Sequence, residues 1–205
     1  MPRKLTLLVG ALVCLAGQAV AQTVGTPVFM APYRAFTKSE FSATLSDPGA
    51  GFAMEGAYRY GSGIWDIGIR GGFWNSDTGG DDDLYLLAGV DFRYRVIEHS
   101  EGFPLDGALT FGVGGAFGDN SFGVLPVGLS MGRRVEIENS TVSFVPYLQP
   151  VLGFAFGEGF GDLDDDLIFA LGIGVDFKLS SRFDLRITGG VGDIEGIGIG
   201  FAWVR

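Results

Sequence analysis

The residues that could carry acid–base or nucleophilic chemistry are few. The chain has one histidine, His99, and one cysteine, Cys14. Catalysis by paired groups needs a base beside a nucleophile or a second acid, and here carboxylates would have to fill both places. We interpret His99 as a solvated residue of a turn. The sequence therefore predicts a protein with no catalytic activity, no cofactor and no metal centre.

Two acidic stretches are the other candidates for chemistry. The first holds Asp77, Asp81, Asp82 and Asp83, and the second holds Glu158, Asp162, Asp164, Asp165 and Asp166. Hard cations such as Ca²⁺ and Mg²⁺ bind several carboxylate oxygens at once. Neither stretch has the spacing of a calcium-binding loop. We expect a solvated negative rim, with a Ca²⁺ or Mg²⁺ site in these loops as the alternative.

The segments that must position these residues alternate between apolar and polar side chains. Trp65, Ile67 and Ile69, for example, alternate with Asp66 and Arg70. A period of two is typical of strands with two different faces. Ten such segments follow residue 38, with Gly, Asp, Asn and Ser clustered between them as in turns. The sequence predicts an all-β protein of ten strands; eight would also place both termini at one end.

The second face of these segments is mostly Gly, Ala and Ser, and the chain holds 35 Gly and 18 Phe. Small residues suit the crowded interior of a narrow barrel, whereas a water-facing surface would carry many more charged residues. The apolar face is bulky, and its aromatic residues lie near the strand ends, as at the two interfaces of a membrane barrel. We therefore predict a single closed antiparallel transmembrane β-barrel. A soluble barrel with an apolar interior is the alternative.

The N-terminus resembles a secretory signal. A basic Arg3-Lys4 pair precedes an apolar core, and Ala19 and Ala21 form a cleavage site before Gln22. We predict a cleaved signal peptide at 1–21, an extended lead-in at 22–37 and the barrel at 38–205. Cleavage would remove Cys14 and two positive charges, so the net charge would fall from −10 to −12. This charge excludes nucleic acid as a partner.

The chain resembles bacterial outer-membrane β-barrel domain proteins. The resemblance rests on the signal, on residues 56–61 (GAYRYG) and 65–72 (WDIGIRGG), and on an alternating last strand. It implies a location in the bacterial outer membrane, with its lipid and lipopolysaccharide as partners. It also implies insertion by the barrel assembly machinery through a C-terminal strand signal, for which Phe201 and Trp203 are the candidates.

The period-two pattern directs charged side chains of both signs into the lumen, toward the periplasmic end. The predicted lumen charge network consists of Glu55, Arg59, Asp66, Arg70, Asp91, Arg93, Arg95, Asp106, Arg134, Glu136, Asp176, Lys178, Asp184 and Arg186. Because isolated charges in a narrow, partly dry space are costly, we expect them to pair and to plug the bore. Small residues in the outward half are expected to leave a pocket open to the cell surface.

The functional prediction is an integral outer-membrane protein with a structural or surface-interaction role and a plugged lumen. One alternative is a narrow channel or a carrier for small or lipophilic molecules. Another is a surface-binding protein that acts through the acidic loops.

Pro126, Pro146 and Pro150 fall inside predicted strands. Because proline has no ladder donor, they predict either bulges or a different register there.

Overall fold

The computed structural model describes residues 25–32, 38–49, 51–77, 83–157 and 165–205. The strands are β1 (Glu40–Asp47), β2 (Phe52–Ser62), β3 (Trp65–Ser76), β4 (Asp83–Ile97), β5 (Asp106–Phe117), β6 (Phe122–Gly132), β7 (Val135–Glu136), β8 (Ser143–Gly157), β9 (Asp165–Lys178), β10 (Phe183–Gly192) and β11 (Gly196–Val204). No helix in these ranges is long and apolar enough to cross a membrane.

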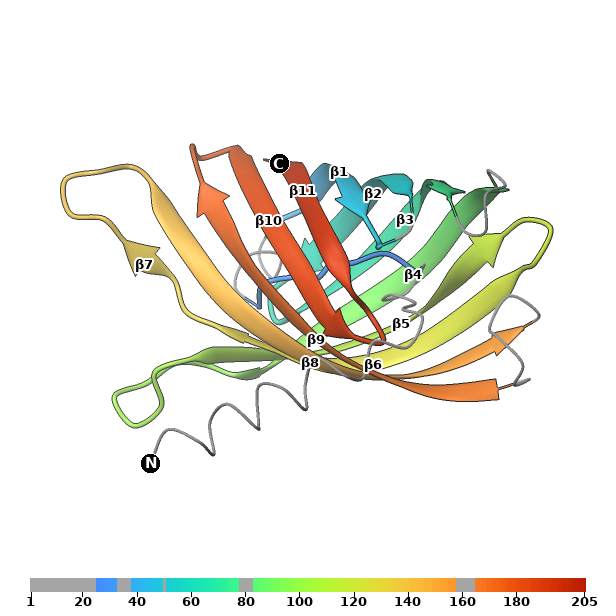
Figure 1. Ribbon diagram of the computed structural model, residues 1–205. Coiled ribbons are helices and arrows are strands. Elements are labelled where there is room, and N and C mark those ends of the chain that lie inside the picture. The colour runs from blue at the N-terminus through green and yellow to red at the C-terminus, as the bar shows by residue number, and fades with distance from the viewer. Residues whose placement is uncertain (1–24, 33–37, 50, 78–82, 158–164) are drawn as a thin grey trace, which may run out of the picture.

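Ten of these strands form a closed antiparallel barrel. Neighbours in sequence pair in order from β1 to β6, β6 pairs with β8, and the order continues to β11, which pairs with β1. The two-residue strand β7 pairs only with the start of β8 and lies beyond the wall (Figure 1). The prediction of an all-β, ten-stranded closed barrel is confirmed.

The three strand prolines leave the register unchanged. The β8–β9 ladder runs without a shift past Pro146 and Pro150. Pairing between β5 and β6 skips the positions around Pro126 and then resumes in the same register. A missing donor affects only one side of a strand, so the ladder on the other side holds the proline in place. In the described ladders the one register shift lies elsewhere, between Arg95 and Ile97 of β4 where it pairs with β5.

The two ends of the barrel differ. The chain enters β1 and leaves β11 at one end, here called the termini end, together with the turns around 63–64, 98–105, 133–142 and 179–182. At the opposite end, here called the loop end, β1 leads to β2, β3 to β4, β5 to β6, β8 to β9 and β10 to β11. An even number of strands places both termini at one end.

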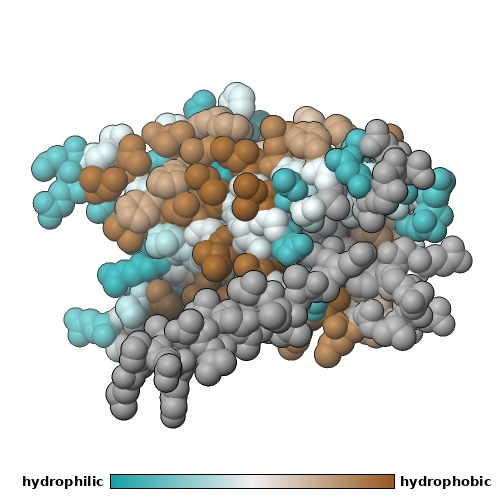
Figure 2. Space-filling model, viewed as in Figure 1, coloured by the Kyte–Doolittle hydropathy of each residue, from teal (hydrophilic) through white to brown (hydrophobic). Residues whose placement is uncertain are grey.

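The outward face of the wall is apolar on every barrel strand. Leu167 is 77% exposed and Ile197 is 69% exposed. On the face seen in Figure 2, hydrophobic side chains cover the wall and hydrophilic ones lie toward its ends. Near the termini end, aromatic rings contact one another from strand to strand: Tyr60, Trp65, Phe92 and Phe111 follow with centroid distances of 6.2, 5.9 and 5.6 Å. The apolar positions of the period-two pattern therefore face outward.

Candidate functional site in the barrel lumen

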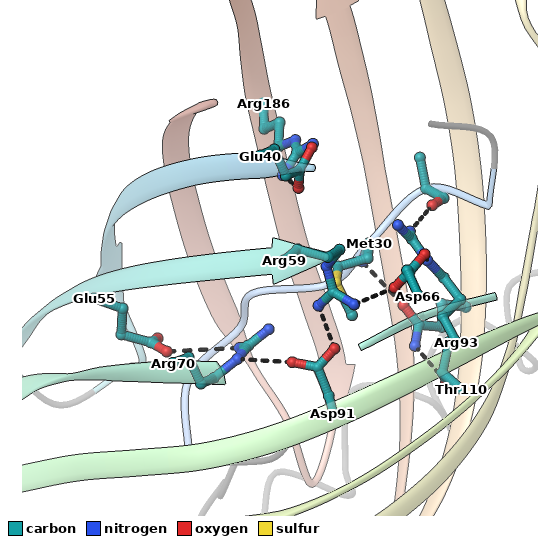
Figure 3. A network of polar contacts seen from close by, with 12 residues as sticks. Met30, Glu40, Glu55, Arg59, Asp66, Arg70, Asp91, Arg93, Thr110 and Arg186 are labelled. Carbon is teal, nitrogen blue, oxygen red and sulfur yellow. Dashed lines mark hydrogen bonds and ion pairs between the residues drawn. The ribbon is translucent and has the colours of Figure 1, made fainter. Parts of the chain in front are cut away.

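Six charged side chains line one wall of the lumen, where β2, β3 and β4 lie side by side. They alternate in sign and contact one another in a row, here called the charge chain: Glu55, Arg70, Asp91, Arg59, Asp66 and Arg93 (Figure 3). Each residue points inward because it occupies the inward position of a period-two strand. The three positive and three negative charges balance, so the row is formally neutral.

The centre of the charge chain is tightly paired. The Arg59 guanidinium contacts Asp91 through one terminal nitrogen and Asp66 through the other. Arg93 Nε donates to the second oxygen of Asp66 at 2.9 Å. All four side chains are at most 5% exposed. At this depth a carboxylate is stable only beside an opposite charge, so the pairs depend on one another.

Arg70 connects the outer member of the charge chain to its centre. Its Nη1 lies 3.5 Å from Glu55 Oε2, and its Nε lies 3.4 Å from Asp91 Oδ2. These contacts are too long for strong hydrogen bonds and act as ion pairs. The contacts of Arg70 are therefore weaker than those of Arg59 at the centre of the charge chain.

A second ionic group lies beside the charge chain, across β1. Arg186 binds both carboxylate oxygens of Glu40, at 2.9 and 2.8 Å, in the bidentate geometry typical of arginine. Its Nε lies 3.3 Å from Asp176. Lys178 and Asp184 face each other across the β9–β10 ladder. These residues extend the charged lining around the barrel toward β1, β9 and β10.

Residues 25–32, here called the N-terminal segment, run through the lumen. Every residue of the segment is buried except Val28, which is half-buried. In Figure 1 the segment is the blue strand-free stretch between the walls. The sequence predicted only an extended lead-in here; its place inside the barrel was not foreseen.

Phe29 is held by its backbone and by its ring. Its N–H donates to Thr188 Oγ1 at 3.2 Å, and its carbonyl accepts from the Tyr147 hydroxyl at 3.0 Å. A Cβ placed on Gly172 would lie 2.1 Å from the ring, and one on Gly190 would lie 2.8 Å from it. Any side chain larger than hydrogen at Gly172 would overlap the ring. The two glycines therefore form a socket that fits Phe29.

Met30 is recognised in the same way by residues of β6 and β8. Its N–H donates to Gln149 Oε1 at 3.0 Å, and its carbonyl accepts from Ser130 Oγ at 2.5 Å. The fully buried Gln149 amide also donates to Thr110 Oγ1 at 3.0 Å, which fixes its orientation. Arg59 Nη2 lies 3.0 Å from the Met30 sulfur. The segment therefore lies between the charged wall and an opposite wall of uncharged polar residues.

The N-terminal segment also contacts both ends of the charge chain. Thr26 Oγ1 donates to Glu55, the first member of the row. Arg93, the last member, donates to the carbonyl of Ala31. Because Glu55 lies farther toward the loop end than Arg93, the segment runs from the termini end at Ala31 toward the loop end at Thr26. The row and the segment thus form one connected polar unit.

The lumen toward the loop end is partly filled by apolar side chains. Its buried members include Trp74, Leu87, Phe122, Ile168 and Ile194. Trp74 stacks on Tyr85 at a centroid distance of 5.3 Å. Small residues were expected to leave a pocket here, and these bulky neighbours occupy part of that space.

Several residues predicted for the charge network lie at its edge or outside it. Glu136 lies on β7, with its side chain 75% exposed, and contacts Arg134 at 3.3 Å. The expectation for Glu136 differs from the structure because the chain extends past the barrel wall after Gly132. Arg95 is half-buried near the termini end and pairs with the exposed Glu98 at 3.9 Å.

His99 and Asp106 meet at the turn between β4 and β5. The His99 backbone N–H donates to Asp106 Oδ1 at 3.1 Å, and its Nδ1 lies 3.3 Å from the same oxygen. The His99 side chain is half exposed, whereas the Asp106 side chain is nearly buried. Asp106 therefore fastens this turn at the termini end and does not join the charge chain.

The acidic loops and the signal lie largely outside the described residues. These positions are Ala19, Ala21, Gln22, Asp81, Asp82, Asp162 and Asp164. Asp83 begins β4, and Asp165 and Asp166 begin β9. Within the described ranges, no group of three or more acidic, histidine or cysteine residues could hold a metal ion. At the other terminus, Phe201 and Trp203 point outward from β11.

The uncharged residues that bind the N-terminal segment are the part of the site that the sequence analysis missed. They are Ser130, Tyr147, Gln149 and Thr188, with Thr110 behind Gln149. All five occupy inward strand positions, so the period-two pattern could have placed them in the lumen. The N-terminal segment that they bind has no periodicity, so its own sequence did not indicate a place in the lumen.

No protein-family profile and no curated protein matches this sequence. The chain is similar in structure to a solved protein from work described as "De novo design of transmembrane beta-barrels". That protein is 15% identical, the match covers 86% of this chain and 100% of the other, and the TM-score is 0.39.

Proposed function

We propose that the protein is an integral β-barrel of the bacterial outer membrane, with a structural or surface-interaction role, no catalysis and a closed lumen. The observation that carries this proposal is the apolar outward face, which continues around all ten barrel strands. Soluble monomers rarely expose an apolar patch of more than a few hundred Å². A closed sheet also leaves no unpaired backbone edge, which is a condition for spanning lipid.

The outward aromatic residues also support a position of the barrel in a bilayer. The outward-facing Tyr and Trp side chains of the described strands lie toward the termini end: Tyr58, Tyr60, Trp65, Tyr94 and Trp203. Toward the loop end, the outward aromatic residues include Phe52, Phe73 and Phe117. Tyr and Trp suit a membrane interface because each joins an apolar ring to a polar atom. We assign the termini end to the periplasm, because a chain that arrives from the periplasm leaves both of its termini on that side.

The closed lumen rests on two features that cross the bore. The charge chain spans β2 to β4, and the N-terminal segment fills the space between that wall and β6, β8 and β10. Paired charges and a bound peptide segment both stand in the way of ions, so we expect no steady conductance. The protein therefore differs from a general porin.

Two measurements test this proposal. Refolded protein should migrate as a heat-modifiable band on unboiled gels, and should be recovered with outer-membrane vesicles after high-salt washing. In planar bilayers, the wild-type protein should show no steady conductance. A soluble protein released by salt would contradict the membrane assignment, and steady porin-like conductance would contradict the closed lumen.

A further inference from the structure

We propose that the lumen is a binding site for an extended, uncharged peptide that carries one phenylalanine, and that the N-terminal segment is the occupant that this chain supplies to itself. Nothing in the segment is charged: residues 25–32 read GTPVFMAP. The site is built from residues of β2, β4, β6, β8, β9 and β10, and these strands pair with one another in the sheet without the segment.

The first argument is that the site recognises peptide backbone. At Phe29 and Met30 all four backbone polar groups are bound by buried side chains of the barrel. The carbonyl of Ala31 is bound by Arg93. These contacts do not depend on the identity of the bound residues. Any extended chain that enters the lumen in the same register could make them.

The second argument is that one side-chain pocket gives the site selectivity. The Phe29 ring lies against Gly172 and Gly190, where even a methyl group would overlap it. A pair of glycines on adjacent inward positions of β9 and β10 leaves a ring-sized space in an otherwise filled wall. An aromatic side chain at that position of the ligand is therefore required for tight binding.

The third argument concerns charge. The charge chain is neutral by internal pairing, and it offers Glu55 and Arg93 to the two ends of the segment. A charged ligand would disturb this balance inside a space from which water is largely excluded, which is costly. The site therefore favours an uncharged peptide over an acidic or basic one.

The test uses the full mature chain in detergent and a fluorescent peptide with the sequence of residues 25–32. In the wild type, the tethered segment acts at an effective concentration on the order of millimolar and should exclude the peptide. Thr26→Asp places a carboxylate beside Glu55, which should loosen the segment and leave the rest of the site intact. This variant should bind the peptide at least about tenfold more tightly than the wild type does.

A second peptide, with alanine in place of phenylalanine, tests the socket and should bind the Thr26→Asp variant at least about tenfold more weakly. If Thr26→Asp gives no heat-modifiable band, Phe29→Ala empties the socket and serves in its place. Glu98→Ala, on an exposed residue outside the site, is the control and should behave as the wild type.

Equal, weak binding of both peptides to the wild type and to a folded loosened variant would overturn the proposal. Equal affinity for the phenylalanine and alanine peptides would overturn it as well, because the socket would then have no part in binding. The assay needs no membrane. A failure here is therefore distinct from a failure of the proposed closed barrel, which would be seen as wild-type conductance.

Discussion

Arg93 binds Asp66 on the neighbouring strand and the backbone carbonyl of Ala31 in the N-terminal segment. One guanidinium thus joins the charged wall of the barrel to the chain that runs through its lumen. Arginine suits this place because its donors are fixed in a plane and can serve two acceptors at once. The stability of the barrel and the closure of its bore therefore depend on the same side chain.

Replacing Arg93 by alanine should lower the free energy of unfolding by about 3–5 kcal/mol, because it removes one partner of a buried ion pair. The matched control is Arg95→Ala, two residues along β4, where the half-buried arginine pairs with the exposed Glu98. That change should cost at most about 1 kcal/mol. Urea unfolding of both variants in lipid vesicles provides the comparison; equal losses would contradict a structural role for the charge chain.

Outward residues should respond to charge according to their depth. Ile173 lies near the middle of β9 and is 53% exposed, whereas Leu179 follows the end of that strand and is 42% exposed. Ile173→Arg should cost about 2–4 kcal/mol and Leu179→Arg at most about 1 kcal/mol, since an arginine near an interface reaches water. Vesicle unfolding titrations measure both. A larger loss at Leu179 than at Ile173 would argue against a bilayer around the wall.

Glycines of the two faces should differ in what they tolerate. Gly172→Ala puts a methyl group into the Phe29 ring and should cost about 1–3 kcal/mol, as overpacking does. Gly56 faces outward, and a Cβ there meets nothing closer than 4.0 Å, so Gly56→Ala should be neutral. In a double-mutant cycle, Phe29→Ala should remove most of the cost of Gly172→Ala. Additive losses would mean that the ring does not occupy the socket.

The alternation of residue types predicted the barrel well because each strand has an apolar outward face and a different, crowded inward face. Trp65 to Arg70 shows this: the apolar residues face outward, and Asp66 and Arg70 lie in the lumen. The local pattern could not predict whether the strands accommodate these prolines, because that depends on which neighbouring strand provides the remaining ladder hydrogen bonds. Glu136 follows the alternating pattern but lies beyond the barrel wall, because periodicity does not show where a strand extends past its neighbour.

The N-terminal segment was beyond reach for a different reason. Its contacts join residues far apart in sequence, such as Met30 with Gln149, which are 119 positions apart. Neither partner has a local signal: the segment has two prolines and no period, and one buried glutamine among apolar residues does not specify its acceptor. Such a contact follows only from the closed barrel, which brings β8 to the same space as the segment.

Export makes a prediction that does not depend on the lumen. The mature protein should begin at Gln22, because Ala19 and Ala21 supply the small residues that signal peptidase requires. N-terminal sequencing of protein extracted from membranes measures this directly. A retained Met1–Ala21 segment would contradict the signal peptide and would add an apolar stretch that the barrel topology does not accommodate.

Opening the lumen should require the loss of both of its barriers. Asp91→Ala breaks the charge chain at the residue that bridges Arg59 and Arg70, yet it leaves the N-terminal segment in place. Phe29→Ala loosens the segment and leaves the charge chain paired. In planar bilayers each single variant should show brief, infrequent openings, whereas the double variant should conduct steadily. Glu98→Ala, which removes an exposed carboxylate at the termini end, is the control and should stay closed. The double variant must fold, as judged by its heat-modifiable band. If it then remains as closed as the wild type, neither element seals the bore. The apolar side chains toward the loop end, such as Phe122 and Ile168, would then be the barrier.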